Sequence, residues 1–328
     1  MSQESVYQLL SAAEGQFLSG QQLSAELGIT RAAVWKAVEA LRRQGCDIEA
    51  HSGCGYRLCG IGDRIGVREI SAFLPQPREA LYVYDSIDST NTQCKRLAMD
   101  GAADGTVVIA EQQTAGRGRK GRSFQSPQGL GLYLAILWRP QCEPTQLLPL
   151  TSLAAVAVSR AIERVTGEAA AIKWPNDLLL REKKIAGILT EMALEGESGQ
   201  IDYVVLGIGI NVHHAAADFT EDVAAMASSL DAVLGKKVSR PQLAAALMEE
   251  LDVLRREAMW QPERYLDEYR KRCITIGRTV QLLRGEQRKT ATALDVDEQF
   301  GLKVRYDDGT EEIVRSGEVS VRGLYGYV

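Results

Sequence analysis

The residues with the clearest chemical character form a short basic loop in the first half of the chain. Residues 116–122 read GRGRKGR, three glycines and four cations, in a protein whose net charge at pH 7 is −5. Glycine lets the backbone wrap closely around a ligand, and backbone amides and arginine forks can hold an oxyanion. The spacing does not fit a Walker A loop or a dinucleotide fingerprint. It predicts an anion-binding loop, and the alternative is a solvated basic loop that touches nucleic acid.

A second motif combines cations, an amide and a carboxylate around a Trp-Pro turn. Lys173, Asn176 and Asp177 bracket the turn, and Lys184 enters the run IAGIL, which is typical of a buried strand. A lysine at the mouth of a buried strand can direct its ammonium at an anion. The alternative is a surface ion pair of Lys184 with Asp177 or Glu182.

Two further segments offer short polar side chains or bare backbone. Residues 85–91 read DSIDSTN, where Ser89, Thr90 and Asn91 are expected at a strand-to-helix junction. Residues 207–211 read GIGIN, and glycine inside a strand often marks the close approach of a ligand. Each segment alone is weak evidence for a binding site.

The first sixty residues predict a helix-turn-helix followed by a β-hairpin wing. Gly28 is expected to end one helix and Thr30 to cap the next, which carries a net charge of +3 over residues 30–43. A winged helix-turn-helix over residues 1–62 is therefore expected to bind DNA. The alternative is a small helical docking domain. The predicted DNA contacts are Thr30, Arg31, Lys36 and Arg42.

Residues 60–66 are typical of a linker. The elements that must position the motifs come after it. Residues 67–270 alternate strands and helices, as in an α/β domain with a mixed sheet. Residues 271–328 contain short strands, and Asp308-Gly309 predicts a type I′ hairpin turn in an SH3-like β-barrel. The predicted fold class is α+β.

Composition narrows the class of protein. Apolar residues make up 45% of the chain and charged residues 25%, which is ordinary for a globular protein. No signal peptide, membrane span or tight C-x2-C pair is apparent, so we expect a cytoplasmic protein with reduced cysteines and no membrane partner. No metal site is assigned to protein side chains.

Taken in order, DSTN, AGRGRKGRSFQSP, KWPNDLLL, KKIAG and GIGIN resemble the biotin–protein ligases. With the winged helix in front and the small barrel behind, the chain is similar to the bifunctional biotin ligases and biotin operon repressors of bacteria. The resemblance implies that biotin, ATP and Mg²⁺ give biotinyl-5′-AMP. Biotin would then pass to a lysine of the biotin carboxyl carrier protein of acetyl-CoA carboxylase.

The same resemblance implies repression of the biotin synthesis genes. Binding of the adenylate would favour a homodimer, whose two winged helices bind operator DNA. Two alternatives remain open: a ligand-sensing winged-helix repressor without ligase activity, and a lipoate or octanoate ligase, which shares the catalytic fold.

The family pattern carries over to individual positions of this sequence. The catalytic residues it implies are Lys184, Arg119 and Asp177. The implied biotin-binding residues are Ser89, Thr90, Asn91, Gln113, Gly116, Arg117, Arg119, Lys184, Gly187 and Gly207. The implied nucleotide- and phosphate-binding residues are Arg117, Arg119, Arg122, Lys173, Asn176 and Asn211.

One departure from the family pattern concerns the segment after Asn211. The related repressors cover the adenine with a tryptophan there, and this chain has none. Phe219 and Met226 are the candidates to replace it. His213 and His214 are expected at the surface.

Overall fold

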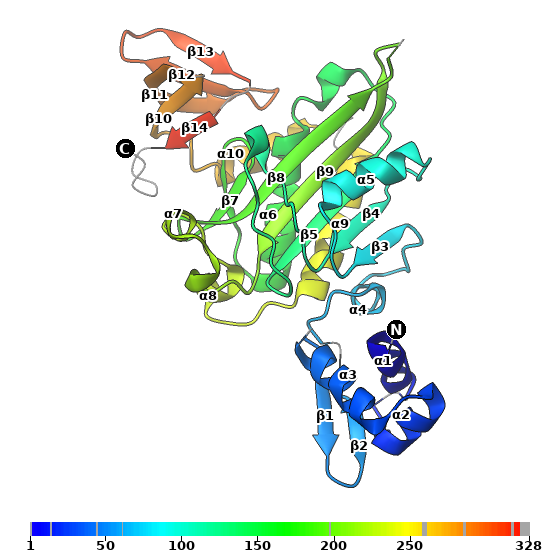
Figure 1. Ribbon diagram of the computed structural model, residues 1–328. Helices are drawn as coiled ribbons and strands as arrows, with labels where there is room; N and C mark the ends of the chain where they lie inside the picture. The colour runs from blue at the N-terminus through cyan, green and yellow to red at the C-terminus, as the bar shows by residue number, and fades with distance from the viewer. Residues whose placement is uncertain are drawn as a thin grey trace.

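The chain forms three units arranged along its length in a computed structural model, which describes residues 2–13, 15–43, 45–60, 62–196, 198–257, 261–284, 287–315 and 318–321. A small helical unit lies at one end, a large sheet with its helices in the middle and a small sheet at the other end (Figure 1). Helices and strands are mixed in this order, so the α+β fold class is confirmed.

The N-terminal unit is a winged helix-turn-helix. It contains α1 (Ser2–Ala12), α2 (Gly20–Leu27) and α3 (Arg31–Arg43), followed by the antiparallel pair β1 (Ile48–His51) and β2 (Gly55–Leu58). Gly28 ends α2 with a left-handed φ of 64°, and the Thr30 hydroxyl accepts the Ala33 amide at 3.2 Å at the start of α3. Both predicted helix boundaries are confirmed.

The central unit is built on a mixed seven-stranded sheet. Its strands are β3 (Leu81–Tyr84), β4 (Val107–Ala110), β5 (Gly131–Trp138), β6 (Ala171–Lys173), β7 (Asp177–Leu180), β8 (Lys183–Leu194) and β9 (Ile201–Asn211). Their spatial order is β3-β4-β5-β9-β8-β7-β6, with β3 and β4 parallel and every other pair antiparallel. The long antiparallel pair β8 and β9 forms the middle of the sheet.

Helices cover both faces of this sheet (Figure 1). α5 (Thr90–Met99) packs Cys94 and Ala98 on one face, and α6 (Leu150–Thr166) and α9 (Arg240–Glu257) cover the other. α10 (Glu263–Arg272) packs against α6. Residues 144–166 are long and apolar enough to cross a membrane, but 67% of the apolar window is buried inside the protein, as expected for a core helix.

Three short helices complete the central unit. α4 (Val67–Ser71) leads into it, and α7 (Glu221–Ala224) and α8 (Leu230–Leu234) lie in the segment after β9. Residues 60–66 join the first two units as predicted, and their described part is packed rather than loose. The Asp63 amide donates to the Gly45 carbonyl at 2.7 Å, and a side chain at Gly62 would overlap that same carbonyl.

The C-terminal unit is a five-stranded antiparallel sheet in the order β13-β12-β11-β10-β14. Its strands are β10 (Thr279–Arg284), β11 (Gln287–Val296), β12 (Leu302–Tyr306), β13 (Glu311–Val314) and β14 (Glu318–Val321). A hairpin does turn at Asp308-Gly309, but the predicted type I′ geometry is wrong. Only Gly309 has a positive φ, of 85°, whereas a type I′ turn needs two such residues. Closure of this sheet into an SH3-like barrel remains a prediction.

Candidate functional site

The four chemical motifs meet in one cavity of about 690 Å³ on the face of the central sheet. The predicted residues that line it are Ser89, Thr90, Asn91, Gln113, Arg117, Arg119, Arg122, Lys173, Asn176, Asp177, Lys184, Gly187, Gly207 and Asn211. Gly116 is the exception, because it is buried and does not line the cavity. A side chain there would overlap the Phe124 carbonyl, so this glycine is needed to fold the loop.

One end of the cavity is a polar corner at the start of α5. The carboxamide oxygen of Gln113 accepts the Thr90 amide at 2.8 Å and the Thr90 hydroxyl at 3.0 Å. The Gln113 amide nitrogen donates to the Ser126 hydroxyl at 2.8 Å. Ser89 precedes the helix and is buried. Donors and acceptors are therefore fixed in place at the predicted strand-to-helix junction.

The glycines of GIGIN make room for side chains from other segments. A side chain at Gly207 would overlap the carboxamide of Asn91, and one at Gly209 would meet the Phe124 ring at 2.6 Å. Gly187 pairs with Gly209 across the strands, and a Cβ there would lie 3.6 Å from the Lys184 side chain. The floor of the cavity is thus bare backbone opposite Lys184.

Asn91 is held over this floor by Glu191, a residue that the sequence pattern did not single out. The Asn91 amide donates to Glu191 Oε2 at 2.9 Å, and Lys95 Nζ lies 2.6 Å from Glu191 Oε1. Burial would raise the pKa of Glu191, but the hydrogen bonds from Lys95 and Asn91 outweigh it and lower the pKa. Arg117 of the basic loop also reaches this carboxylate, at 3.3 Å.

The basic loop closes on itself and on the Trp-Pro turn. The Gly118 amide donates to the Arg122 carbonyl at 2.7 Å. Arg119 donates to the Asn176 side-chain oxygen at 2.8 Å, which ties the loop to the second motif. The peptide bond between Trp174 and Pro175 is cis. The Trp174 indole N–H donates to the Phe300 carbonyl of the C-terminal unit at 2.9 Å.

Lys184 and Asp177 form an ion pair inside the cavity. Lys184 Nζ lies 2.7 Å from Asp177 Oδ1, and the Asn176 amide donates to the same oxygen at 3.1 Å. The alternative that the sequence left open, an ion pair with Asp177, is therefore present. However, the pair lies in the cavity rather than on an outer surface, since both residues line it.

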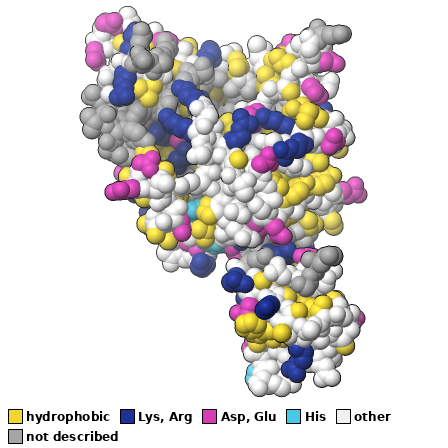
Figure 2. Space-filling model, viewed as in Figure 1, with side chains coloured by type: hydrophobic (Ala, Val, Ile, Leu, Met, Phe, Trp, Pro, Cys, Tyr) yellow, Lys and Arg dark blue, Asp and Glu magenta, His cyan; other side chains and the backbone are white. Residues whose placement is uncertain are grey.

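Cations dominate the lining of the cavity. Among the residues that the structure describes, the cations that line it are Arg117, Arg119, Lys120, Arg122, Lys173 and Lys184. The described carboxylates that line it as well are those of Asp177 and Asp222. Figure 2 shows Lys and Arg side chains gathered across the middle of this face. Such a cavity attracts polyanions.

The segment after β9 forms the remaining wall. The Asn211 amide donates to the Ser228 carbonyl at 3.1 Å, and Phe219 and Met226 both line the cavity. The Phe219 ring stacks on His214 with centroids 5.0 Å apart. Burial lowers the pKa of His214 to about 4, so its ring is neutral at pH 7. The expectation that His213 and His214 lie at the surface is wrong, because both are buried or nearly so.

Comparison with known proteins identifies the three units. Residues 2–57 match an HTH domain, residues 83–211 the biotin/lipoate A/B protein ligase family, and residues 275–322 the biotin protein ligase C terminal domain. The bifunctional ligase/repressor BirA of Escherichia coli is 33% identical over 314 residues, 94% of each chain. The chain belongs to the biotin protein ligase family. The family resemblance inferred from the sequence motifs is confirmed.

Other relatives agree with this membership. The bifunctional ligase/repressor BirA of Bacillus subtilis is 41% identical over 236 residues, covering 71% of this chain and 72% of the relative. The biotin protein ligase from Aquifex aeolicus in complex with biotin and ATP has a TM-score of 0.63 and 29% identity. That match covers 75% of this chain and 99% of the Aquifex chain.

The winged helix of this ligase presents some of its predicted DNA contacts outward. Arg31 and Lys36 are exposed on α3, with Trp35 (55% exposed) beside them. Arg42 instead donates to the Ile48 carbonyl at 2.9 Å and pairs with Glu39, so it holds the helix to the wing. Trp35 is absent from the predicted DNA contacts, although an exposed aromatic among basic residues is visible in the sequence.

Proposed function

We propose that the cavity joins biotin to ATP and then passes biotin to a lysine of a biotin carboxyl carrier protein. Membership of the ligase family makes the chain an adenylate-forming enzyme with biotin and ATP as substrates. The observation that supports the assignment of this cavity is its composition. It combines a fixed polar corner, bare glycine backbone and a cluster of Lys and Arg side chains in a single space.

The first step joins two anions. A biotin carboxylate oxygen attacks the α-phosphorus of ATP, the bond to the bridging oxygen breaks, and pyrophosphate leaves with the displaced electron pair. No enzyme nucleophile is needed, because the carboxylate itself attacks. Lys184 and Arg119 offset the repulsion between the reactants and stabilise the charge that develops on the phosphoryl oxygens. The remaining contribution is alignment of the two reacting groups.

The biotin head group fits the polar corner. Ser89, Thr90 and Gln113 supply donors and acceptors that are already oriented by hydrogen bonds to one another. The valeryl chain would then run over the bare backbone of Gly187 and Gly207, toward Lys184. Asn91 lies over Gly207, so this side chain touches the substrate or moves as the substrate enters.

The nucleotide fits the opposite end. Phe219 offers a flat ring on the cavity wall, supported from behind by the buried ring of His214, and takes the place of the missing tryptophan against adenine. Asn211 lies at the same wall. Three residues on the Trp-Pro turn and the basic loop are assigned to the phosphates: Arg122, Lys173 and Asn176.

A magnesium ion would accompany ATP. Mg²⁺ prefers oxygen ligands, and proteins bind it through one or two carboxylates together with substrate phosphates. Asp222 lines the cavity apart from the ion pair of Asp177 with Lys184, so a carboxylate is present that would hold the ion together with the phosphates. The ion would neutralise phosphate charge. The part of the chain that the structure describes has no cluster of three His, Cys, Asp or Glu residues for a resident metal.

The second step needs a neutral amine. The carrier lysine attacks the acyl carbon of the adenylate, AMP leaves, and the amine loses a proton. Asp177 is the carboxylate assigned to accept that proton or to orient the amine.

The winged helix adds a second function. The chain would act as a repressor when the adenylate favours a homodimer that binds operator DNA. The proposed domains are residues 1–62, 67–270 and 271–328.

The first experiment is biotin-dependent exchange of pyrophosphate into ATP, with lipoate and octanoate as parallel substrates. Exchange with biotin and Mg²⁺ but not with the fatty acids is the expected result. Exchange with lipoate or octanoate alone would reassign the substrate. No exchange with any acid would leave a ligand-sensing repressor. Sedimentation with and without the adenylate then tests dimerisation.

A further inference from the structure

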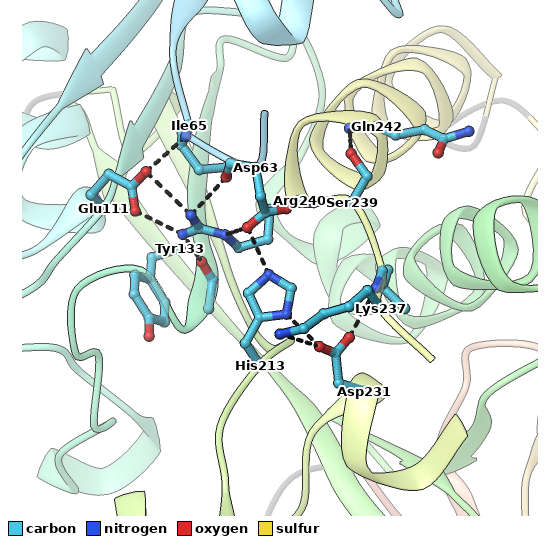
Figure 3. A network of polar contacts seen from close by, with 12 residues as sticks. Asp63, Ile65, Glu111, Tyr133, His213, Asp231, Lys237, Ser239, Arg240 and Gln242 are labelled. Carbon is cyan, nitrogen blue, oxygen red and sulfur yellow. Dashed lines mark hydrogen bonds and ion pairs between the residues drawn. The ribbon is translucent and has the colours of Figure 1, made fainter. Parts of the chain in front are cut away.

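A network of polar side chains connects Asp63, His213, Asp231 and Arg240 (Figure 3). Its centre is His213, whose ring lies between two carboxylates. His213 Nε2 is 2.7 Å from Asp63 Oδ2, and His213 Nδ1 is 2.8 Å from Asp231 Oδ2. Asp63 comes from the segment that follows the wing, and Asp231 from the start of α8. We name these three residues the clasp.

The clasp closes the wall segment at its base. His213 and Asp231 flank residues 214–230, which include Phe219 and Met226 of the cavity lining. The Asp231 amide also donates to the Val212 carbonyl at 2.9 Å. Both ends of this segment are therefore fixed to each other.

Asp63 connects that base to the N-terminal unit. Its amide donates to the Gly45 carbonyl at the end of the recognition helix, and its carboxylate bonds His213. A side chain at Gly62 would overlap the Gly45 carbonyl, and one at Gly45 would press tightly against Asp63 and Arg64 at 3.1 Å. A contiguous path of direct contacts thus runs from α3 through Asp63 and His213 to the cavity wall.

Arg240 fixes Asp63 from the other side. Arg240 is 1% exposed and donates from Nε to Asp63 Oδ2 at 2.6 Å and from its backbone amide to Asp63 Oδ1 at 2.8 Å. It also pairs with Glu111 at 2.7 Å. Burial would raise the pKa of Asp63, but the contacts with His213 and Arg240 outweigh it and lower the pKa. The carboxylate is therefore charged and rigidly held.

Both ring nitrogens of His213 face carboxylate oxygens, so the ring bridges Asp63 and Asp231. Arg240 in turn bridges Asp63 and Glu111, so these side chains form one connected network. The adjacent His214 ring is neutral and adds no charge at pH 7.

We infer that Asp63 and His213 are positioning residues that couple the nucleotide wall to the winged helix, so that ordering of the wall by a bound adenylate also fixes the DNA-binding unit. The inference rests on the proposed function, because it takes the adenylate as the ligand of the cavity. The residues act through the wall segment and touch neither substrate. Coupling between two sites typically changes affinity by ~5- to 150-fold.

Hydrogen exchange on the full chain tests this coupling, with and without biotin, ATP and Mg²⁺. In the wild-type protein the ligands should slow exchange at least about fivefold in residues 213–231 and also in residues 62–66. In His213→Asn and Asp63→Asn, the ligands should slow exchange in the wall segment alone. The KM for ATP should rise about tenfold in both variants with kcat nearly unchanged.

Lys237→Ala is the matched control. Lys237 lies 3.2 Å from the same Asp231 but is 85% exposed, and such surface pairs contribute little, so its variant should behave as wild type. If the ligands slow hydrogen exchange in residues 213–231 of the wild-type protein but not in residues 62–66, the inference is overturned, even if a variant fails to fold. Unchanged protection of both segments in a folded His213→Asn would also overturn it. An absence of protection everywhere, together with no pyrophosphate exchange, would remove the proposed function itself.

Discussion

Lys184 Nζ lies 2.7 Å from Asp177 Oδ1, although the half-reactions that we propose give the two residues different partners. The ammonium is assigned to the phosphate in the first step, and the carboxylate to the carrier lysine in the second. While the two residues are paired, the Lys184 ammonium occupies Asp177 Oδ1 and competes with the carrier lysine for that oxygen. An adenylate phosphate that draws Lys184 away would release Asp177. The base of the second step would then become available only after the first step is complete.

Replacement of Lys184 by alanine should lower the rate of biotin-dependent pyrophosphate exchange by about 100- to 1,000-fold, as for other lost stabilisers of transition-state charge. The loss should appear mainly in kcat. Lys183→Ala is the control, since Lys183 donates to the Ala225 carbonyl and does not line the cavity. Its exchange rate should stay within about twofold of wild type. Wild-type exchange by Lys184→Ala would exclude the lysine from catalysis.

Asp177→Asn should separate the two half-reactions. The amide keeps the shape of the side chain but cannot accept the proton of the carrier lysine. Single-turnover transfer from preformed biotinyl-AMP should slow by about 100-fold, within the usual range for lost proton transfer, while exchange changes much less. The deficit should shrink at high pH, where the free amine is more abundant. Transfer at the wild-type rate would mean that the carrier lysine needs no help from this carboxylate.

Gly207→Ala should raise the KM for biotin by about tenfold, because the new methyl group overlaps the carboxamide of Asn91 and overpacked sites cost ~1–3 kcal/mol. Gly196→Ala is the matched control, since no atom lies within 4 Å of its added carbon. Adding Asn91→Ala to Gly207→Ala should recover part of the biotin affinity by relieving the overlap. If the single variant binds biotin as wild type does, the floor of the cavity is wider than the structure indicates.

His214 should make stability depend on pH. Burial lowers its pKa from 6.5 to about 4, so between these values the unfolded chain binds a proton that the folded chain does not. The free energy of unfolding therefore falls as the pH drops from about 7 to 4, by on the order of 3 kcal/mol from this group. Urea denaturation of wild type and His214→Phe over this range gives the difference. Parallel pH profiles for the two proteins would contradict the assignment.

The sequence predicted the site better than it predicted the connections behind the site. DSTN, GRGRKGR and GIGIN carry polar groups or bare backbone that are recognisable from residue type alone, and strand pairing brings them together. Residue type alone does not predict that the Asn91 side chain occupies the space above Gly207. It depends on how α5 packs over β9, more than a hundred residues further along the chain.

The positions of Asp63 and His213 in the fold were also not predictable from the local sequence. Asp63 and His213 have ordinary surface residue types, so the pattern placed one in a linker and the other at the surface. Their burial follows from partners far away in sequence, Arg240 and Asp231, which no local period reveals. The hairpin at Asp308-Gly309 shows a smaller limit: the dipeptide predicts a tight turn correctly but does not determine its type.

The Trp174 side chain has a consequence for anyone who wishes to shorten this protein. It is 2% exposed, its indole N–H reaches the Phe300 carbonyl, and its backbone amide donates to the Thr275 hydroxyl at 3.0 Å. Asn176 and Asp177 follow it in the chain after Pro175. A truncated enzyme that ends near residue 270 would keep all the proposed catalytic side chains but lose the support of the turn that aims two of them. We therefore expect the smallest working catalyst to extend past Phe300, although the proposed catalytic side chains all precede residue 270.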